Sequence, residues 1–224
     1  SYKDKLKKLK KQIKDKDDVF VKNNPSHLFG LKKFTKANKI NLSNFRKILN
    51  IDISNNEIEL EGLCTIKQVL DVLIPRGYML PIIPDMSHLS MGGIVSGVGG
   101  GSASFKNGCF HDSMTECDVL TGDGKVLTCS EKVNTDLFRS IPNLLGTMGY
   151  ITRLKMKIVK TKPYVNTINH KYDNYGDFIN NINKFKLDKS VDFLDGTIID
   201  SKTFICIVGK LTDEEPDEFD NFVN

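Results

Sequence analysis

A glycine-rich segment between Gly92 and Gly108 constrains this chain more than any other feature. Six of the ten residues from Gly92 to Gly101 are glycine. Glycine loses more conformational freedom on folding than any other residue, so this density indicates positive φ angles or the close approach of a bulky group. Ser102 and Ser104 follow the run. Bare backbone amides beside two hydroxyl groups are typical of a site for a phosphate or diphosphate.

A tight packing corner and a mobile linker are the alternative explanations of the glycines. Ile94, Val95 and Val98 interrupt the run, which disfavours a linker. The Walker pattern G-x-x-x-x-G-K-[ST] does not occur, and the dinucleotide fingerprint G-x-G-x-x-G would need glycine at Ser102. The G-x-S-x-G elbow of hydrolases is also missing. Any diphosphate is therefore held by a different kind of loop.

Composition places the chain among ordinary globular proteins. Of its 224 residues, 39% are hydrophobic and 27% are charged, which excludes disorder throughout, a coiled coil and a disulfide-rich miniprotein. No apolar run approaches the roughly 18 residues of a membrane-spanning helix. The first residues lack the apolar core of a secretion signal, so secretion is not expected.

Charge is unevenly distributed along the chain. Residues 1–22 carry nine Lys and four Asp, whereas residues 213–224 carry six acids and no base. Leu6, Leu9 and Ile13 have helical spacing among the lysines, as in a solvated helix with a thin apolar stripe. We expect a frayed basic extension here, and a helix that binds a membrane surface or a partner is the alternative. No arginine-rich patch with interleaved aromatic residues occurs in the middle of the chain, so we expect no nucleic-acid binding.

Five cysteines form an odd set without a C-x-x-C pair, and Cys206 lies in an apolar strand-like run. Buried, reduced thiols explain this pattern best. We therefore expect an intracellular, reducing location, in the cytoplasm or at the periphery of a membrane. Cys and His are too scattered for zinc, so no metal site is predicted.

Helices and strands interleave without strict βα alternation, which predicts an α+β fold. A capped helix is expected after Thr65 and ends near Pro75. Gly122-Asp123-Gly124 predicts the turn of a hairpin. The other expected elements are strands at Ile51–Ile53, Glu57–Leu60, Arg153–Val159, Phe193–Ile199 and Thr203–Val208, a short helix at Asp136–Ile141, and a helix within residues 173–187.

Several ordered motifs resemble the vanillyl-alcohol oxidase / p-cresol methylhydroxylase (PCMH) class of flavoproteins, within which the closer likeness is to delta-24-sterol reductase (Diminuto-like) proteins. The motifs run from about Ser26 to about Glu215. They are Ser26-His27-Leu28-Phe29, Pro81-Ile82-Ile83-Pro84, Leu89-Ser90-Met91-Gly92-Gly93, the glycines and serines from Gly97 to Gly108, Asp118–Val126, Asp136-Leu137-Phe138, Gly146-Thr147-Met148-Gly149-Tyr150 and Val191–Gly196.

The resemblance implies an FAD-dependent oxidoreductase that passes hydride through the flavin to or from a small or lipidic, sterol-like substrate, with NADPH as a candidate electron donor. The class lays FAD between two α+β subdomains beneath a cap domain. The implied cofactor-binding residues are Pro84, Leu89, Gly92, Gly93, Gly97, Gly99, Gly101, Ser102, Ser104, Gly108, Gly146, Gly149 and Ile151. His111, beside Asp112, is the candidate proton donor, and a structural histidine is the alternative.

The chain also departs from the class. Residues 1–24 form only a lysine-rich extension where a first subdomain with its own diphosphate loop is expected. Residues 25–162 then form the PCMH-type FAD-binding domain, with its second subdomain prominent, and residues 163–224 begin an α+β cap with an acidic tail. Gly101 and Phe105 stand where the sterol-reductase branch often has glutamate and histidine.

Two hypotheses remain open from the sequence. The chain is a flavin-dependent oxidoreductase, or a piece of one, or it is a non-catalytic binding or structural protein that keeps the fold. A membrane surface contacted through residues 1–22 and a partner chain that completes the FAD cleft are the additional partners considered.

Overall fold

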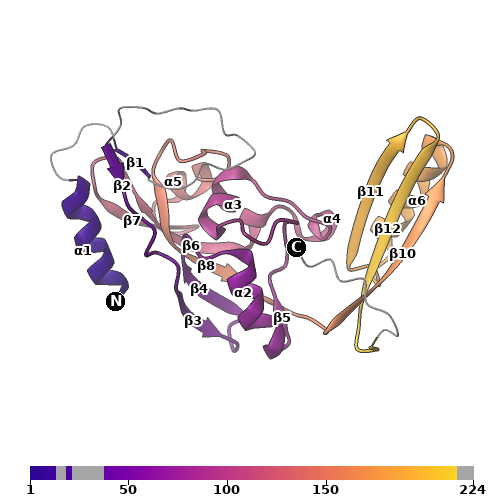
Figure 1. The fold of residues 1–224 in the computed structure, drawn as a ribbon, viewed down its shortest axis with the longest axis horizontal. Coiled ribbons are helices and arrows are strands. Elements are labelled where there is room, and N and C mark those ends of the chain that lie inside the picture. The colour runs from indigo at the N-terminus through magenta and orange to yellow at the C-terminus, as the bar shows by residue number, and fades with distance from the viewer. Residues whose placement is uncertain (14–18, 22–37, 216–224) are drawn as a thin grey trace.

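The computed structural model describes residues 1–13, 19–21 and 38–215. An antiparallel sheet of five strands, in the order β3-β4-β8-β6-β7, forms the centre of the main body (Figure 1). Its strands are β3 (Ile48–Asp52), β4 (Glu57–Glu61), β6 (Met114–Leu120), β7 (Val126–Ser130) and β8 (Tyr150–Lys157). The sheet brings β8 between β4 and β6, so segments almost one hundred residues apart become neighbours.

Short helices pack on the sheet and bury one continuous core. They are α2 (Ile66–Leu73), α3 (Met91–Gly97) and α5 (Thr135–Ser140). Thr65 caps the N-terminus of α2, as predicted. The cap is a capping box: the Thr65 hydroxyl accepts from the Gln68 amide, and the Gln68 side chain accepts from the Thr65 amide. Leu60, Leu154 and Val95 are fully buried in this core.

Charged side chains on the sheet are joined by Arg153. Its guanidinium binds both carboxylate oxygens of Asp118 at 2.8 Å, Glu59 at 2.7 Å and Glu116 at 2.6 Å. Asp118 and Arg153 are themselves buried. Paired, hydrogen-bonded charges of this kind are tolerated inside a protein, whereas an unpaired one is not.

The first helix, α1 (Tyr2–Ile13), packs against the main body. Leu9 is 1% exposed and lies in a small core with Ile40, Phe45 and Leu120. The ammonium group of Lys5 contacts the buried carboxylate of Glu61. The helical spacing was therefore correctly predicted, but the expectation of a frayed extension is wrong for residues 2–13, because distant segments supply the apolar surface that the stripe needs.

Beside α1, strands β1 (Val19–Val21) and β2 (Asn38–Ile40) pair in parallel. The predicted Ser26–Phe29 motif and part of the acidic tail lie outside the described residues. Within the described ranges, no helix has the length and apolar character needed to cross a membrane.

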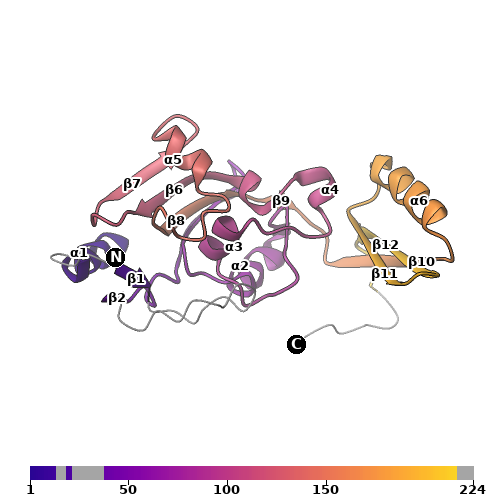
Figure 2. The same cartoon turned by 90° about the horizontal axis from the view of Figure 1, so that it is seen from above.

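A three-stranded antiparallel sheet with one helix forms a second unit at the other end of the molecule (Figure 2). Its elements are β10 (Tyr164–Tyr172), α6 (Tyr175–Leu187), β11 (Phe193–Asp200) and β12 (Thr203–Thr212), with β12 in the middle. Phe178 of α6 packs on Phe204 and Cys206 of β12. We call this the three-stranded unit.

Short elements connect these parts: η1 (Ile74–Arg76), β5 (Tyr78–Met79), α4 (Ser104–Asn107), η2 (Phe110–Ser113) and β9 (Val159–Lys160). β5 pairs with β9, so the segment after α2 lies beside the one that leads into the three-stranded unit. The mixture of helices and antiparallel sheets confirms the predicted α+β class.

Candidate functional site

The glycine-rich segment folds as a short helix followed by a tight loop. Helix α3 begins after Ser90 and ends at Val98, whose φ of 54° and ψ of 69° are left-handed. The Gly99 amide then donates to the Ile94 carbonyl at 3.0 Å and closes the helix. A β-branched residue in the left-handed region is uncommon and costs energy, and such strain clusters at ligand-binding sites.

Packing within the protein accounts for part of the glycine content. At Gly92, an added Cβ would lie 3.0 Å from the Gly62 carbonyl oxygen, because the Gly92 amide donates to that oxygen at 2.8 Å. At Gly101, an added Cβ would overlap the Ile83 carbonyl, and at Gly99 it would overlap the Ile94 side chain. These three positions exclude a methyl group without any ligand.

Gly97 differs from its neighbours. Apart from its own helix and its chain neighbours, an added Cβ there would meet no atom of the described residues within 4 Å, and its φ is not positive. At Gly100 the nearest atom would be the Ser104 hydroxyl oxygen at 3.5 Å, and at Gly93 it would be the Ser90 hydroxyl oxygen at 2.8 Å. Nothing in the surrounding protein requires glycine at Gly97, which fits the close approach of a group from outside the chain.

The two serines after the run hold the backbone in place. The Ser104 hydroxyl accepts from the Gly101 amide at 3.0 Å, and the Ser104 amide donates to the Gly101 carbonyl at 2.9 Å. The Ser102 carbonyl accepts from the Leu194 amide at 2.9 Å, across to the three-stranded unit. Both serines thus shape the loop, while their hydroxyl groups keep hydrogen-bonding capacity.

Pro84 and Leu89 support the run from the preceding segment. Pro84 is buried, and its ring lies 3.4 Å from the position of a Cβ at Gly99. The Leu89 carbonyl accepts from the Ile66 amide at 3.1 Å and so ties this segment to α2. These predicted residues set the position of α3.

A shallow hollow lies between α3 and the loop before β8, and its enclosed space of about 10 Å³ is no larger than one water molecule needs. It is lined by Ser96, Val119, Ile141, Leu144, Gly146, Met148, Gly149 and Ile151. The Leu145 amide donates to the Ser96 carbonyl at 3.1 Å, which joins the loop to α3. Leu145 is 57% exposed and Met148 is 53% exposed, so the loop presents apolar side chains to solvent.

The structure thus brings together three of the predicted cofactor residues, Gly146, Gly149 and Ile151, with Ser96 of α3. Gly146 and Gly149 both have positive φ, which is why the loop turns back toward α3. Ser96 and Met148 were not predicted. Ser96 stands directly before Gly97, and that adjacency is the sequence signal that could have identified it.

His111 lies in η2, which is hydrogen-bonded to the glycine run. The Phe110 amide donates to the Gly99 carbonyl at 2.8 Å. The Nδ1 atom of His111 is buried, and it has no hydrogen-bond partner within the part of the chain that the structure describes. A buried polar atom without a partner is rare and calls for an explanation. A bound group would supply one.

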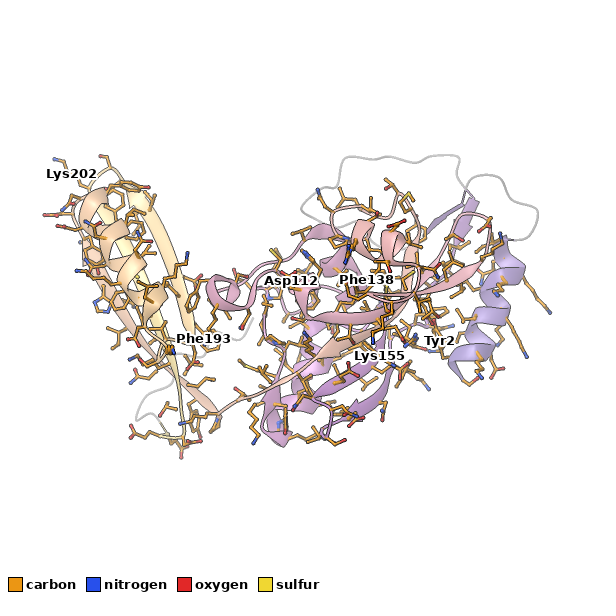
Figure 3. All side chains as sticks on the ribbon, turned by 180° about the vertical axis from the view of Figure 1, so that it is seen from behind. Tyr2, Asp112, Phe138, Lys155, Phe193 and Lys202 are labelled. Carbon is orange, nitrogen blue, oxygen red and sulfur yellow. The ribbon has the colours of Figure 1, made fainter. Side chains whose placement is uncertain are left out.

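Asp112 does not orient His111 through a hydrogen bond. Its Oδ1 atom is 3.7 Å from Nε2 of His111, while Oδ2 accepts from the Cys109 amide at 2.7 Å. A Cβ added at Gly108 would overlap the same carboxylate. Asp112 and Gly108 therefore build the turn before η2. Figure 3 shows Asp112 at the end of the main body that faces the three-stranded unit, where Phe193 lies.

Asp195 of the three-stranded unit is hydrogen-bonded to Ser102, directly after the glycine run. Burial and the nearby carboxylate of Asp85 raise its pKa, while a hydrogen bond with Ser102 acts in the opposite direction. Among the described residues, no three His, Cys, Asp or Glu side chains are grouped as metal ligands. The polar groups near the glycine run thus include backbone amides, hydroxyl groups, the imidazole of His111 and the carboxyl groups of Asp112 and Asp195.

Comparison with known proteins matches residues 4–130 to the family described as an FAD binding domain. A human Delta(24)-sterol reductase is 32% identical over 133 residues, which cover 59% of this chain and 26% of that protein. A Delta(24)-sterol reductase homologue of Caenorhabditis elegans is 28% identical over 199 residues, 84% of this chain and 38% of that protein. Cytokinin dehydrogenase 4 of Arabidopsis thaliana is 31% identical over 140 residues, 61% of this chain and 27% of that protein.

The matched segments span about a quarter to two fifths of these curated relatives. The family match begins within α1 and ends in β7, so it includes the helix that packs on Leu120. The domain boundaries at residues 24 and 162 remain predictions.

Proposed function

This chain belongs to the FAD-binding domain family, and on that premise we propose that it is the flavin-holding part of an oxidoreductase of the sterol-reductase type. The observation that carries the proposal is the open space at Gly97, where the protein itself does not require glycine. FAD supplies the hydride chemistry when bound, and the protein contributes binding, orientation and exclusion of water.

The residues present fit such a cofactor. The amides of Val98, Gly99 and Gly101 already donate within the protein. The Gly100 amide and the hydroxyl groups of Ser102 and Ser104 would therefore be the groups that bind its diphosphate. The hollow beside Ser96 has a mostly apolar lining but holds only about one water molecule, so it could contact an edge of the cofactor and not enclose a ring. Gly146, Gly149 and Ile151 would line that part of the cofactor.

We assign proton transfer to His111, whose Nδ1 atom has no hydrogen-bond partner among the described residues. Reduction of a carbon–carbon double bond adds hydride to one carbon and a proton to the neighbouring carbon, and an imidazole is a group that can supply that proton. Asp112 is excluded as its orienting partner, since its carboxylate is used by Cys109.

For the substrate, we propose a small molecule with an apolar body, on the basis of relatives named for sterols and for cytokinin. A sterol-like lipid is the more specific proposal, with NADPH as electron donor. Five free cysteines, four of them buried, support a reducing intracellular location in the cytoplasm or at a membrane periphery.

The lysines of α1 support a second proposal, contact with an anionic membrane surface. Lys3, Lys7, Lys8, Lys10 and Lys11 are exposed. The apolar stripe of α1 is used inside the protein, so attraction would act through charge alone and weaken with salt. Replacing these lysines with Gln should abolish binding to anionic vesicles at low salt. Equal binding by the wild-type and substituted proteins would refute the proposal.

The competing function is a non-catalytic binding or structural protein. It is favoured by Gly92, Gly99 and Gly101, whose lack of side chains is explained by packing alone.

A visible spectrum of the purified protein, followed by titration with FAD, tests the proposed function. We expect flavin absorbance, or saturable uptake of added FAD accompanied by quenching of flavin fluorescence. Riboflavin, which lacks the diphosphate, is the matched control ligand and should bind more weakly. A protein without flavin that takes up no FAD would support the non-catalytic alternative.

A further inference from the structure

The segment Ser102–Lys106 of the main body contacts the three-stranded unit through hydrogen bonds, an ion pair and an aromatic side chain. Figures 1 and 2 show α4 as the element of the main body that lies nearest this unit. The segment directly follows the glycine run. The same stretch of backbone therefore contacts both the proposed cofactor site and the second unit.

Backbone pairing forms the first contact. The Leu194 amide donates to the Ser102 carbonyl at 2.9 Å. β11 is an edge strand of its sheet, so Ser102 satisfies a backbone group that the sheet leaves unpaired. The side chain of Asp195 is hydrogen-bonded to Ser102 as well.

An ion pair forms the second contact. The Lys106 ammonium group lies 2.9 Å from Asp192 Oδ1 and 3.1 Å from the Val191 carbonyl oxygen. Oδ2 of Asp192 accepts from the Leu211 amide at 2.8 Å. Asp192 thus joins Lys106 to both β11 and β12. Phe105 packs against the core of the three-stranded unit beside these groups.

The other end of the segment is fixed to the glycine loop. Gly101 and Ser104 exchange two hydrogen bonds, and Gly101 lies directly on the Ile83 backbone. Because of these bonds, a displacement of the glycine loop on ligand binding would also displace Ser102 and Lys106. Packed structures pass on such shifts because they have little free space.

We propose that Lys106 and Asp192 are positioning residues, which couple ligand occupancy of the glycine loop to the placement of the three-stranded unit. The inference rests on the proposed binding of FAD by that loop. It predicts reciprocity: bound FAD should strengthen the contact at Leu194, and loss of the contact should weaken FAD binding by the same factor.

Amide hydrogen exchange at Leu194, measured in the full chain with and without FAD, tests the coupling. FAD should slow exchange at Leu194 about fivefold or more, a typical coupling factor. Lys106→Met should speed that exchange in the FAD-free protein and raise the Kd for FAD by a similar factor. Lys106→Arg, which keeps the charge, should restore both values.

The matched control is Lys67→Met, which removes an ion pair of the same 2.9 Å separation within α2 and should change neither value. Normal FAD binding with unchanged exchange at Leu194, or equal Kd values for the wild-type and Lys106→Met proteins, would overturn the coupling while leaving the proposed function intact. A wild-type protein that binds no FAD would refute the proposed function, and the coupling with it.

Discussion

The hydroxyl group of Tyr2 donates a hydrogen bond to Oδ2 of Asp118 at 2.9 Å, across 116 positions of the chain. The same hydroxyl lies 2.8 Å from Thr152 Oγ1. Burial raises the pKa of Tyr2, so the phenol stays protonated. Helix α1 is therefore bound to β6, which carries Asp118, and to β8, which carries Thr152 and Arg153.

Tyr2→Phe should lower the free energy of unfolding by about 1 kcal/mol, the usual net value of one hydrogen bond. Asp118 would keep its bonds with Arg153 and Thr128, so the loss should be no larger. Urea unfolding at pH 7 measures it. Tyr175→Phe, at an exposed position, is the control. An unchanged value for Tyr2→Phe would mean that α1 is not held by this bond.

Stability should fall in acid partly because of Asp118. Burial alone would raise its pKa, but hydrogen bonds and the positive charge of Arg153, helped by Thr128 and Tyr2, hold the pKa below its ordinary value. The carboxylate therefore stabilises the fold above its unfolded pKa of about 3.9, and this contribution is lost as the pH falls further. Asp118→Asn should cost about 2 kcal/mol at pH 7 and reduce the difference in stability between pH 7 and pH 3. A mutant with the full wild-type acid dependence would contradict this assignment.

The periodic elements were predictable from the sequence, because their signals are local. The turn at Gly122-Asp123-Gly124 does join β6 to β7, and the helix expected within residues 173–187 is α6, Tyr175–Leu187. The packing of α1 was not predictable, because Asp118 and Leu120 are far away in sequence.

The candidate site was harder to predict because glycine has a low helix propensity. Nothing local indicates that Met91–Gly97 is a helix, since glycine costs about 1 kcal/mol relative to alanine in a helix interior. The requirement for glycine at Gly92 comes from the contact with Gly62, because an added Cβ would lie 3.0 Å from the Gly62 carbonyl oxygen. The sequence also could not separate glycines required by packing, such as Gly101, from Gly97.

Substitutions at Gly97 and Gly101 should have opposite effects. Gly97→Leu places a side chain in open space at the end of α3, so the stability should stay level or rise by up to about 1 kcal/mol. FAD binding should weaken about tenfold or more, equivalent to about 1.4 kcal/mol. Gly101→Ala should instead destabilise the fold by about 1–3 kcal/mol, because the methyl group overlaps Ile83. Thermal unfolding and FAD titration measure both. Unchanged FAD affinity in Gly97→Leu would show that the cofactor lies elsewhere.

His111→Leu should stabilise the FAD-free protein by about 1 kcal/mol, because it removes a buried polar atom that has no partner. The same change should weaken FAD binding or abolish turnover of the bound flavin. Unfolding with and without FAD separates the two effects. His170→Leu is the control, since His170 lies 4.9 Å from the ring of Phe185 in the three-stranded unit. A destabilised His111→Leu protein would identify His111 as a structural residue.

The contact between Gly62 and Gly92 restricts how this gene can vary. A Cβ at Gly62 would overlap the Ile151 carbonyl, and one at Gly92 would lie 3.0 Å from the Gly62 oxygen. Every missense change at either codon adds at least a methyl group at the crossing of α3 and β8. A substitution at Gly62 should therefore be rejected because it collides with the backbone of β8, whereas one at Gly92 should be tolerated only if α3 or Gly62 moves by a few tenths of an ångström.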